Sequence, residues 1–225
     1  MGRKVFISVL GTGFYGECRY VDKTIPFKSS ETRFVQQASL EYIHAKDWTS
    51  GDTALIILTE KARTDNWDRQ IKMRKNLITA KEEPYSGLQA IIEKMNLPFK
   101  TQDISIPDGK DESEMWKIFS SVFENLQDND ELYFDLTHSF RYLPMLILVL
   151  SNYAKFLKHV VVKHISYGNY EARDKETKEA PIVDLLPLSA LQDWTFAAGQ
   201  FLDSGNVKKL VDLSNQALKP ILAKA

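Results

Sequence analysis

The fold is decided by a stretch past the middle of the chain, ELYFDLTHSFRYLPMLILVL, residues 131–150. Its apolar residues 132–136 follow an Asn-Asp turn pair and predict a buried strand. The long apolar run after it predicts a helix. Because proline lacks a backbone N–H and clashes with the preceding turn, Pro144 must lie near the helix start, which we place near positions 140–141. Residues 137–139 are then a tight strand-to-helix turn, a location where α/β sheets bind ligands and where a helix N-terminus favours phosphate.

The bulk composition is that of an ordinary globular protein. The chain has 225 residues, 44% hydrophobic and 26% charged, with a net charge of −1, so no global basic field attracts DNA or a membrane. Cys18 is the single cysteine, which excludes an internal disulfide, and the four histidines lack metal-ligand spacing. The longest apolar run, residues 143–150, is far shorter than the roughly 20 residues of a membrane span. We therefore expect a cytoplasmic protein without metal or cofactor.

The order of the apolar segments predicts an α/β fold. Strands alternate with helical patterns, which favours a Rossmann-like, mostly parallel sheet with helices on both faces. The expected strands are residues 4–10, 52–58, 99–106, 132–136 and 159–167, and the expected helices are residues 39–44, 67–75, 87–95 and 113–126. A run beginning at Arg33 is expected to pair with residues 18–21 as a hairpin. Residues 188–225 predict two helices broken at Gly205, after a first domain of residues 1–187.

A glycine-rich turn follows the first strand. Residues 11–16, GTGFYG, match the dinucleotide-binding pattern G-x-G-x-x-G. The pattern is meaningful only when a helix comes next, and residues 17–26 instead suggest an extended segment. A turn through which the backbone approaches some other ligand is the favoured interpretation, and a plain tight turn is the alternative.

Five of the expected strands end in polar or glycine-rich turns. These are residues 11–15, 59–63, 107–110, 137–141 and 167–170. A parallel sheet brings such turns to one rim. Their hydroxyls, cations, aromatic rings and glycines suit phosphates, sugar hydroxyls and stacked bases, but form a thin set for hydrolysis.

The central turn contains residues with different expected roles. His138 is expected to be a hydrogen-bonded turn residue rather than an acid or base. Asp135 is expected to cap the next helix or to orient Thr137, and Ser139 fits an N-cap. Arg141 would oppose the dipole of the helix that it begins, which favours a contact with a ligand or partner.

The segment Asp135-Leu-Thr-His-Ser-Phe-Arg141 resembles the D-x-T-H-G-F/L-R signature of CRISPR-associated Rossmann-fold (CARF) sensor domains. The segments 10–13 (LGTG), 58–62 (LTEKA) and 167–168 (YG) fit the same family, so that the resemblance covers about residues 4–187. Ser139 departs from the usual glycine and adds a side chain where the backbone approaches the ligand.

The resemblance implies a homodimer that binds a cyclic oligoadenylate across its two-fold axis, with cyclic tetra-adenylate favoured and hexa-adenylate the other size. This ligand is the second messenger of type III CRISPR antiviral defence, and the domain would control an attached effector. Carried onto matching positions, the resemblance nominates these ligand-binding residues: Gly11, Thr12, Gly13, Tyr15, Thr59, Glu60, Lys61, Thr137, His138, Ser139, Arg141, Tyr167 and Gly168. It nominates no catalytic residue.

Family members often carry a HEPN ribonuclease with an R-x4-6-H motif, and no arginine of this chain has a histidine at that distance. We therefore expect effector activity outside this chain, with residues 188–225 as a linker or the start of an effector domain. One alternative is a ring nuclease that cleaves its own ligand, assisted by Lys61, His138 and Arg141. The weaker alternative is a dinucleotide-dependent Rossmann enzyme.

Overall fold

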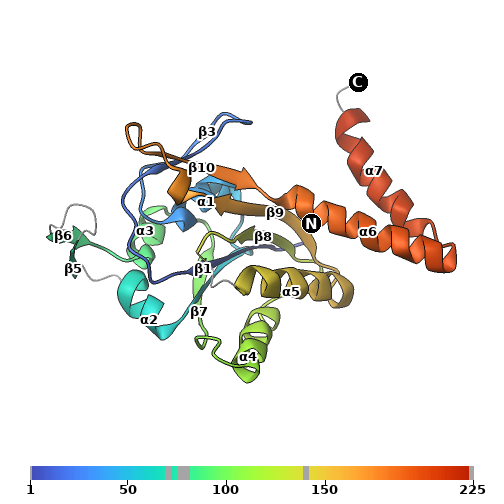
Figure 1. The fold of residues 1–225 in the computed structure, drawn as a ribbon, viewed down its shortest axis with the longest axis horizontal. Helices are drawn as coiled ribbons and strands as arrows, with labels where there is room; N and C mark the ends of the chain where they lie inside the picture. Colours follow the sequence, from blue (N-terminus) through green and yellow to red (C-terminus); the bar gives the residue numbers. More distant parts are fainter. Residues whose placement is uncertain (1, 69–71, 76–81, 139–141, 223–225) are drawn as a thin grey trace. The chain divides into compact units, whose positions relative to one another are not determined.

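The computed structural model describes residues 2–68, 72–75, 82–138 and 142–222, in two compact units divided between Asp184 and Leu185. The first unit is built on an eight-stranded sheet with the order β3-β2-β10-β9-β8-β1-β4-β7 (Figure 1). Its strands are β1 (Lys4–Leu10), β2 (Arg19–Asp22), β3 (Phe27–Lys28), β4 (Thr53–Leu58), β7 (Lys100–Ser105), β8 (Glu131–Asp135), β9 (Val161–Gly168) and β10 (Glu179–Asp184).

The sheet is mostly parallel. β1 pairs in parallel with β4 and β8, β4 with β7, and β8 with β9. β10 runs antiparallel to β9, and β2 continues the sheet parallel to β10. Strand β1 therefore lies inside the sheet, as its mostly apolar sequence predicts, and the expected Rossmann-like α/β fold is confirmed.

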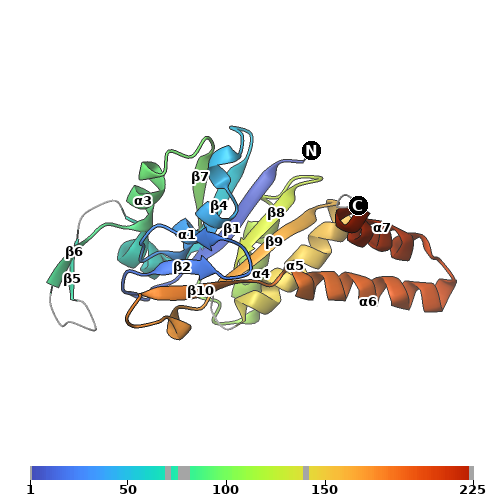
Figure 2. The same ribbon diagram turned by 90° about the horizontal axis from the view of Figure 1, so that it is seen from above.

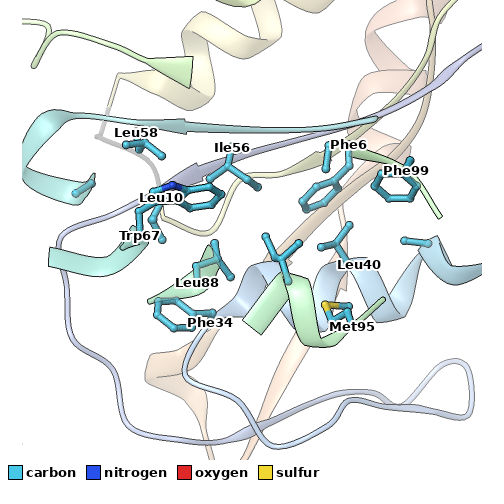
Figure 3. Packing of buried hydrophobic residues seen from close by; sticks show 14 of the residues in the cluster. Phe6, Leu10, Phe34, Leu40, Ile56, Leu58, Trp67, Leu88, Met95 and Phe99 are labelled. Atoms are coloured by element: carbon cyan, nitrogen blue, oxygen red, sulfur yellow. The ribbon is translucent and has the colours of Figure 1, made fainter. Parts of the chain in front are cut away.

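Helices cover both faces of this sheet (Figures 1 and 2). On one face lie α1 (Val35–Tyr42) and α3 (Leu88–Lys94), and on the other lie α4 (Glu112–Phe123) and α5 (Leu143–Leu157). Alternate residues of β1 point to opposite faces. Phe6 and Leu10 pack with Leu40 of α1 and Leu88 of α3 in one buried cluster (Figure 3).

Shorter elements complete the first unit. They are the 3-10 turns Ala45–Asp47 and Tyr170–Ala172, α2 (Glu60–Ala62), the π-helical turn Arg63–Trp67, and the antiparallel pair β5 (Lys72–Lys75) and β6 (Glu82–Tyr85).

Two predicted elements were wrong. The run beginning at Arg33 does not pair with residues 18–21, because residues from Val35 onward form α1 and β2 pairs with β3 instead. Thr32 accounts for the difference: its hydroxyl accepts the Phe34 N–H at 3.0 Å and turns the chain into the helix.

The second wrong element is the helix expected at residues 67–75. The described part of that range ends a π-helical turn at Trp67 and then forms β5, whose pairing with β6 overrides the helical spacing. The helix start expected near positions 140–141 lies outside the described residues. Described residues of α5 begin at Leu143, with Pro144 in the first turn.

The second unit consists of α6 (Leu186–Ser204) and α7 (Lys208–Leu222). Gly205 ends α6 with φ of 69°, a left-handed conformation that glycine adopts at little cost, and the predicted break at this residue is found. Within the described part of the chain, no helix is long and apolar enough to cross a membrane.

Candidate ligand-binding site

A cavity of about 240 Å³ opens at the carboxyl ends of β1, β4 and β8. It is lined by Val9, Leu10, Gly11, Thr12, Gly13, Tyr15, Thr59, Thr137 and His138. Three of the five expected rim turns therefore share one cavity. Wider hollows on the outer face of α4 and beside β7 contain none of the nominated residues.

The turn after β8 is held by a buried carboxylate. Asp135 is fully buried, and one of its oxygens accepts the hydroxyl of Thr137 at 2.6 Å and the backbone N–H of the same residue at 3.1 Å. The other oxygen accepts the hydroxyl of Ser8, on the neighbouring strand β1, at 2.7 Å. Burial raises the pKa of the Asp135 carboxyl, and these hydrogen bonds oppose the rise. Asp135 thus orients Thr137, one of its two expected roles.

The Thr137 hydroxyl also reaches the end of β9. It accepts the backbone N–H of Gly168 at 2.8 Å while donating to Asp135, so it links two strand ends. A Cβ at Gly168 would lie 2.6 Å from a methyl group of Val35, which explains the glycine by close packing. Neither Tyr167 nor Gly168 lines the cavity, and the structure gives Gly168 an anchoring position.

His138 forms the aromatic wall of the cavity with Tyr15. Their rings stack with centroids 4.6 Å apart and planes at 22°. Burial lowers the pKa of His138 to about 4, so its imidazole is neutral at pH 7. Tyr15 also meets Tyr170 edge to face, at 4.8 Å between centroids. This wall can stack on a base, but it supplies no cation.

The glycine turn after β1 passes close to this wall. A Cβ at Gly13 would lie 2.8 Å from the ring of Tyr15, and one at Gly11 would lie 3.4 Å from the Cβ of His138. Further along, Gly16 donates its N–H to the hydroxyl of Tyr170 at 2.8 Å. Glycine at position 13 is therefore required for Tyr15 to sit on His138.

Asn66 is a residue of the site that the sequence did not reveal. Its side-chain amide donates to the carbonyl of Gly11 at 2.6 Å and to that of Gly13 at 2.9 Å. The Asn66 carbonyl oxygen accepts the hydroxyl of Tyr85 at 2.7 Å. No local signal marks either residue, because an asparagine in a helix-like segment and a tyrosine near a proline are common.

The turn after β4 contributes mainly through Thr59. This buried residue caps α2, its hydroxyl accepting the N–H of Ala62 at 3.3 Å. Glu60 and Lys61 are exposed and do not line the cavity, and Lys61 forms an ion pair of 3.1 Å with Asp65. No lysine or arginine is among the described residues that line the cavity. The nominated Ser139 and Arg141 lie outside the described residues.

The segment after Gly16 does not form the helix of a dinucleotide-binding motif. Within residues 17–34, all of them described, the chain pairs Cys18 with Thr32 and then forms β2 and β3. A phosphate there would lack the helix N-terminus on which the motif depends.

A Rossmann-like sheet with a cavity at the carboxyl ends of its central strands defines a class of nucleotide-type ligand-binding domains. The family described as CRISPR system endoribonuclease Csx1, CARF domain, matches residues 5–171. The chain belongs to this family, and the resemblance drawn from its sequence is confirmed.

A curated relative agrees with the family. Over 122 residues, which are 52% of its length, this chain is 32% identical to the CRISPR-associated protein MJ1674 of Methanocaldococcus jannaschii. The matched part covers only 19% of that relative. Together the family and the relative support an ancillary sensor role in type III CRISPR systems.

Proposed function

We propose that this chain senses a cyclic oligoadenylate, with cyclic tetra-adenylate favoured over the hexa-adenylate, and controls an attached effector. The observation that carries the proposal is the cavity itself, in which the glycine turn, Thr59 and the Asp135–His138 turn meet. Backbone of the glycine turn can approach a phosphate closely, and the Tyr15–His138 pair offers a flat wall for an adenine.

A second copy of the chain would complete the site in this proposal. Helix α5 follows the site turn in sequence, and its Met145, Val149 and Phe156 are 68%, 55% and 78% exposed. Their spacing puts these side chains on one side of the helix. Burying such a face in an isologous contact would place two identical cavities about a two-fold axis, which matches a ring made of repeated nucleotides.

The second unit is proposed as a linker or the start of an effector domain. Only Leu185 separates β10 from α6 in the sequence. β10 pairs with β9 through Ile182 and Gly168, and the N–H of Gly168 bonds Thr137 in the cavity wall. This short route, by a hydrogen bond, strand pairing and one covalent connection, supports control of whatever follows α6 by the ligand.

Cleavage of the ring has less support. A ring nuclease would need a group that takes the proton of a ribose 2′-hydroxyl, and the His138 pKa of about 4 makes its imidazole a weak base at pH 7. We therefore expect binding without rapid cleavage. Chromatography of the ring after long incubation with the protein distinguishes the two, because shortened linear products would establish the nuclease.

Titration calorimetry of the purified chain with cyclic tetra-adenylate and cyclic hexa-adenylate tests the proposal, with linear tetra-adenylate as the ligand control. Arg141→Ala should weaken ring binding by about 1–3 kcal/mol, the range for a hydrogen bond to a charged group. Lys117→Ala makes the same charge change on the exposed side of α4 and should leave affinity unchanged. Binding of neither ring would refute the proposal, and an unaltered Arg141→Ala affinity would give that arginine a structural role.

A further inference from the structure

The glycine turn of the cavity is held by the side chain of Asn66, which does not itself line the cavity. Asn66 is 3% exposed and lies in the π-helical turn Arg63–Trp67 that follows α2. Such turns are rare and occur often at functional sites. Asn66 is not among the residues that line the 240 Å³ cavity, whereas Gly11 and Gly13, whose carbonyls it holds, are.

The two hydrogen bonds of the Asn66 amide set the direction of two peptide groups. The described chain contains no cis peptide bond, and in a trans peptide the carbonyl and the following N–H point in opposite directions. Since the carbonyls of Gly11 and Gly13 point toward Asn66, the N–H groups of Thr12 and Phe14 point away from it. One side chain thus fixes the orientation of the backbone that a ligand meets.

Tyr85 in turn fixes the orientation of Asn66. Its single hydroxyl proton is shared between the Asn66 side-chain oxygen, at 2.7 Å, and the backbone carbonyl of Asp65. Because the Gly11 and Gly13 carbonyls can only accept, the amide NH₂ is the end that faces the glycine turn. The Tyr85 ring is held edge-on against Phe14, with centroids 5.5 Å apart. The space left between these side chains and the turn is about 10 Å³, so the turn rests on packed atoms.

We propose that Asn66, held by Tyr85, is a positioning residue of the ligand site: it preorganises the Gly11–Gly13 turn for the ring. This inference rests on the proposed function. Its physical basis is that a turn held in its binding conformation loses less entropy when a ligand arrives.

Three variants of the whole chain test the inference. Asn66→Asp keeps the shape and the acceptor for Tyr85, but it replaces the donor that faces two carbonyls with an oxygen that repels them. Tyr85→Phe keeps the ring packing and removes only the hydroxyl. Ile118→Val, a change at a buried position of α4 on the other face of the sheet, serves as the stability control.

Affinities for cyclic tetra-adenylate and hexa-adenylate are measured at a temperature at which all variants are folded, together with melting temperatures. Asn66→Asp should weaken binding more than tenfold and Tyr85→Phe about two- to fivefold, while Ile118→Val binds like the wild type. In ligand-free NMR spectra, Asn66→Asp and Tyr85→Phe should shift the amide signals of Thr12 and Phe14, which Ile118→Val should not.

The outcomes separate the two proposals. A wild type that binds neither ring refutes the proposed function before any variant is compared. A wild type that binds, with Asn66→Asp no weaker than Ile118→Val, overturns the role of Asn66 alone. Unshifted Thr12 and Phe14 signals in both site variants would also overturn it, and they can be read even if Asn66→Asp lowers the melting temperature.

Discussion

The turn after β8 and the turn after β1 both line the cavity, and they are held in place by different means. The first is anchored by its own residues and the adjacent strand, since Asp135 bonds Thr137 two residues away and Ser8 beside it. The second is a glycine-rich turn with no side-chain anchor of its own at positions 11 and 13, and Asn66 holds it from 53 and 55 residues away. A self-anchored turn should lose stability when its own residues change, whereas a turn held from outside should lose ligand affinity first.

The largest effect is expected from Asp135→Ala. It removes the acceptor of three hydrogen bonds and leaves the buried Ser8 hydroxyl and the half-buried Thr137 donors without it, which should cost about 3 kcal/mol of unfolding free energy. Urea unfolding measures the loss. Asp128→Ala, at an exposed loop position, should change stability by less than about 0.5 kcal/mol. A loss below about 1 kcal/mol for Asp135→Ala would mean that the turn is not self-anchored.

The second-largest effect on stability is expected at the stack of His138 on Tyr15, where the two turns meet. Burial lowers the pKa of His138 from 6.5 to about 4, so folding favours the neutral ring. The stability that this provides is complete above pH 6.5 and is lost as pH falls toward 4. Allowing for partial exposure of the ring, we expect the wild type to lose about 2 kcal/mol more than His138→Gln between pH 7 and pH 4.5.

Unfolding free energies of the two proteins at both pH values check this expectation. Asp135 and the other carboxylates titrate in both proteins, so their contributions cancel in the difference. His159→Gln makes the same change at an exposed histidine and should follow the wild type. Equal losses of unfolding free energy in the wild type and in His138→Gln would show that protonation of the His138 imidazole does not destabilise the fold.

The smallest effect on stability is expected from Gly13→Ala. The new Cβ would lie 2.8 Å from the half-buried Tyr15 ring, which can move aside, so we expect a loss of about 1 kcal/mol. The displaced Tyr15 side chain should leave its stack on His138, which should weaken binding of the cyclic oligoadenylate. Gly51→Ala is the matched control, since its Cβ would meet nothing closer than 3.7 Å. Equal ligand affinity for the two alanine variants would argue against the Tyr15–His138 wall as a binding surface.

The same contrast explains what could be predicted from sequence. The central strands were predictable, because mostly apolar runs such as Lys4–Leu10 and Thr53–Leu58 have few other stable places than a buried parallel sheet. Helix α1 was mispredicted at its start, because Phe34 and Val35 favour strands locally and the turn at Thr32 decides otherwise.

Thr137 and His138, which line the cavity, could be nominated from sequence because their turn follows a strand and carries its own polar residues. Asn66 and Tyr85 were not found, since their role arises only when segments distant in sequence come together. Tyr167 and Gly168 lie outside the cavity wall for the same reason. The carboxyl ends of the strands predict which edge of the sheet binds a ligand, but they do not predict which side chains face the cavity.

The place of β1 between β4 and β8 has a consequence for how the protein is made. Ser8 and its acceptor Asp135 are 127 residues apart. At a synthesis rate of about 5–20 residues per second, a ribosome needs roughly 6–25 s to add the carboxylate after the serine has been made. During that interval the first strand has one of its two parallel neighbours at most, and the cavity cannot exist. Strand β1 thus waits until residue 135 has been added before its place in the sheet is complete.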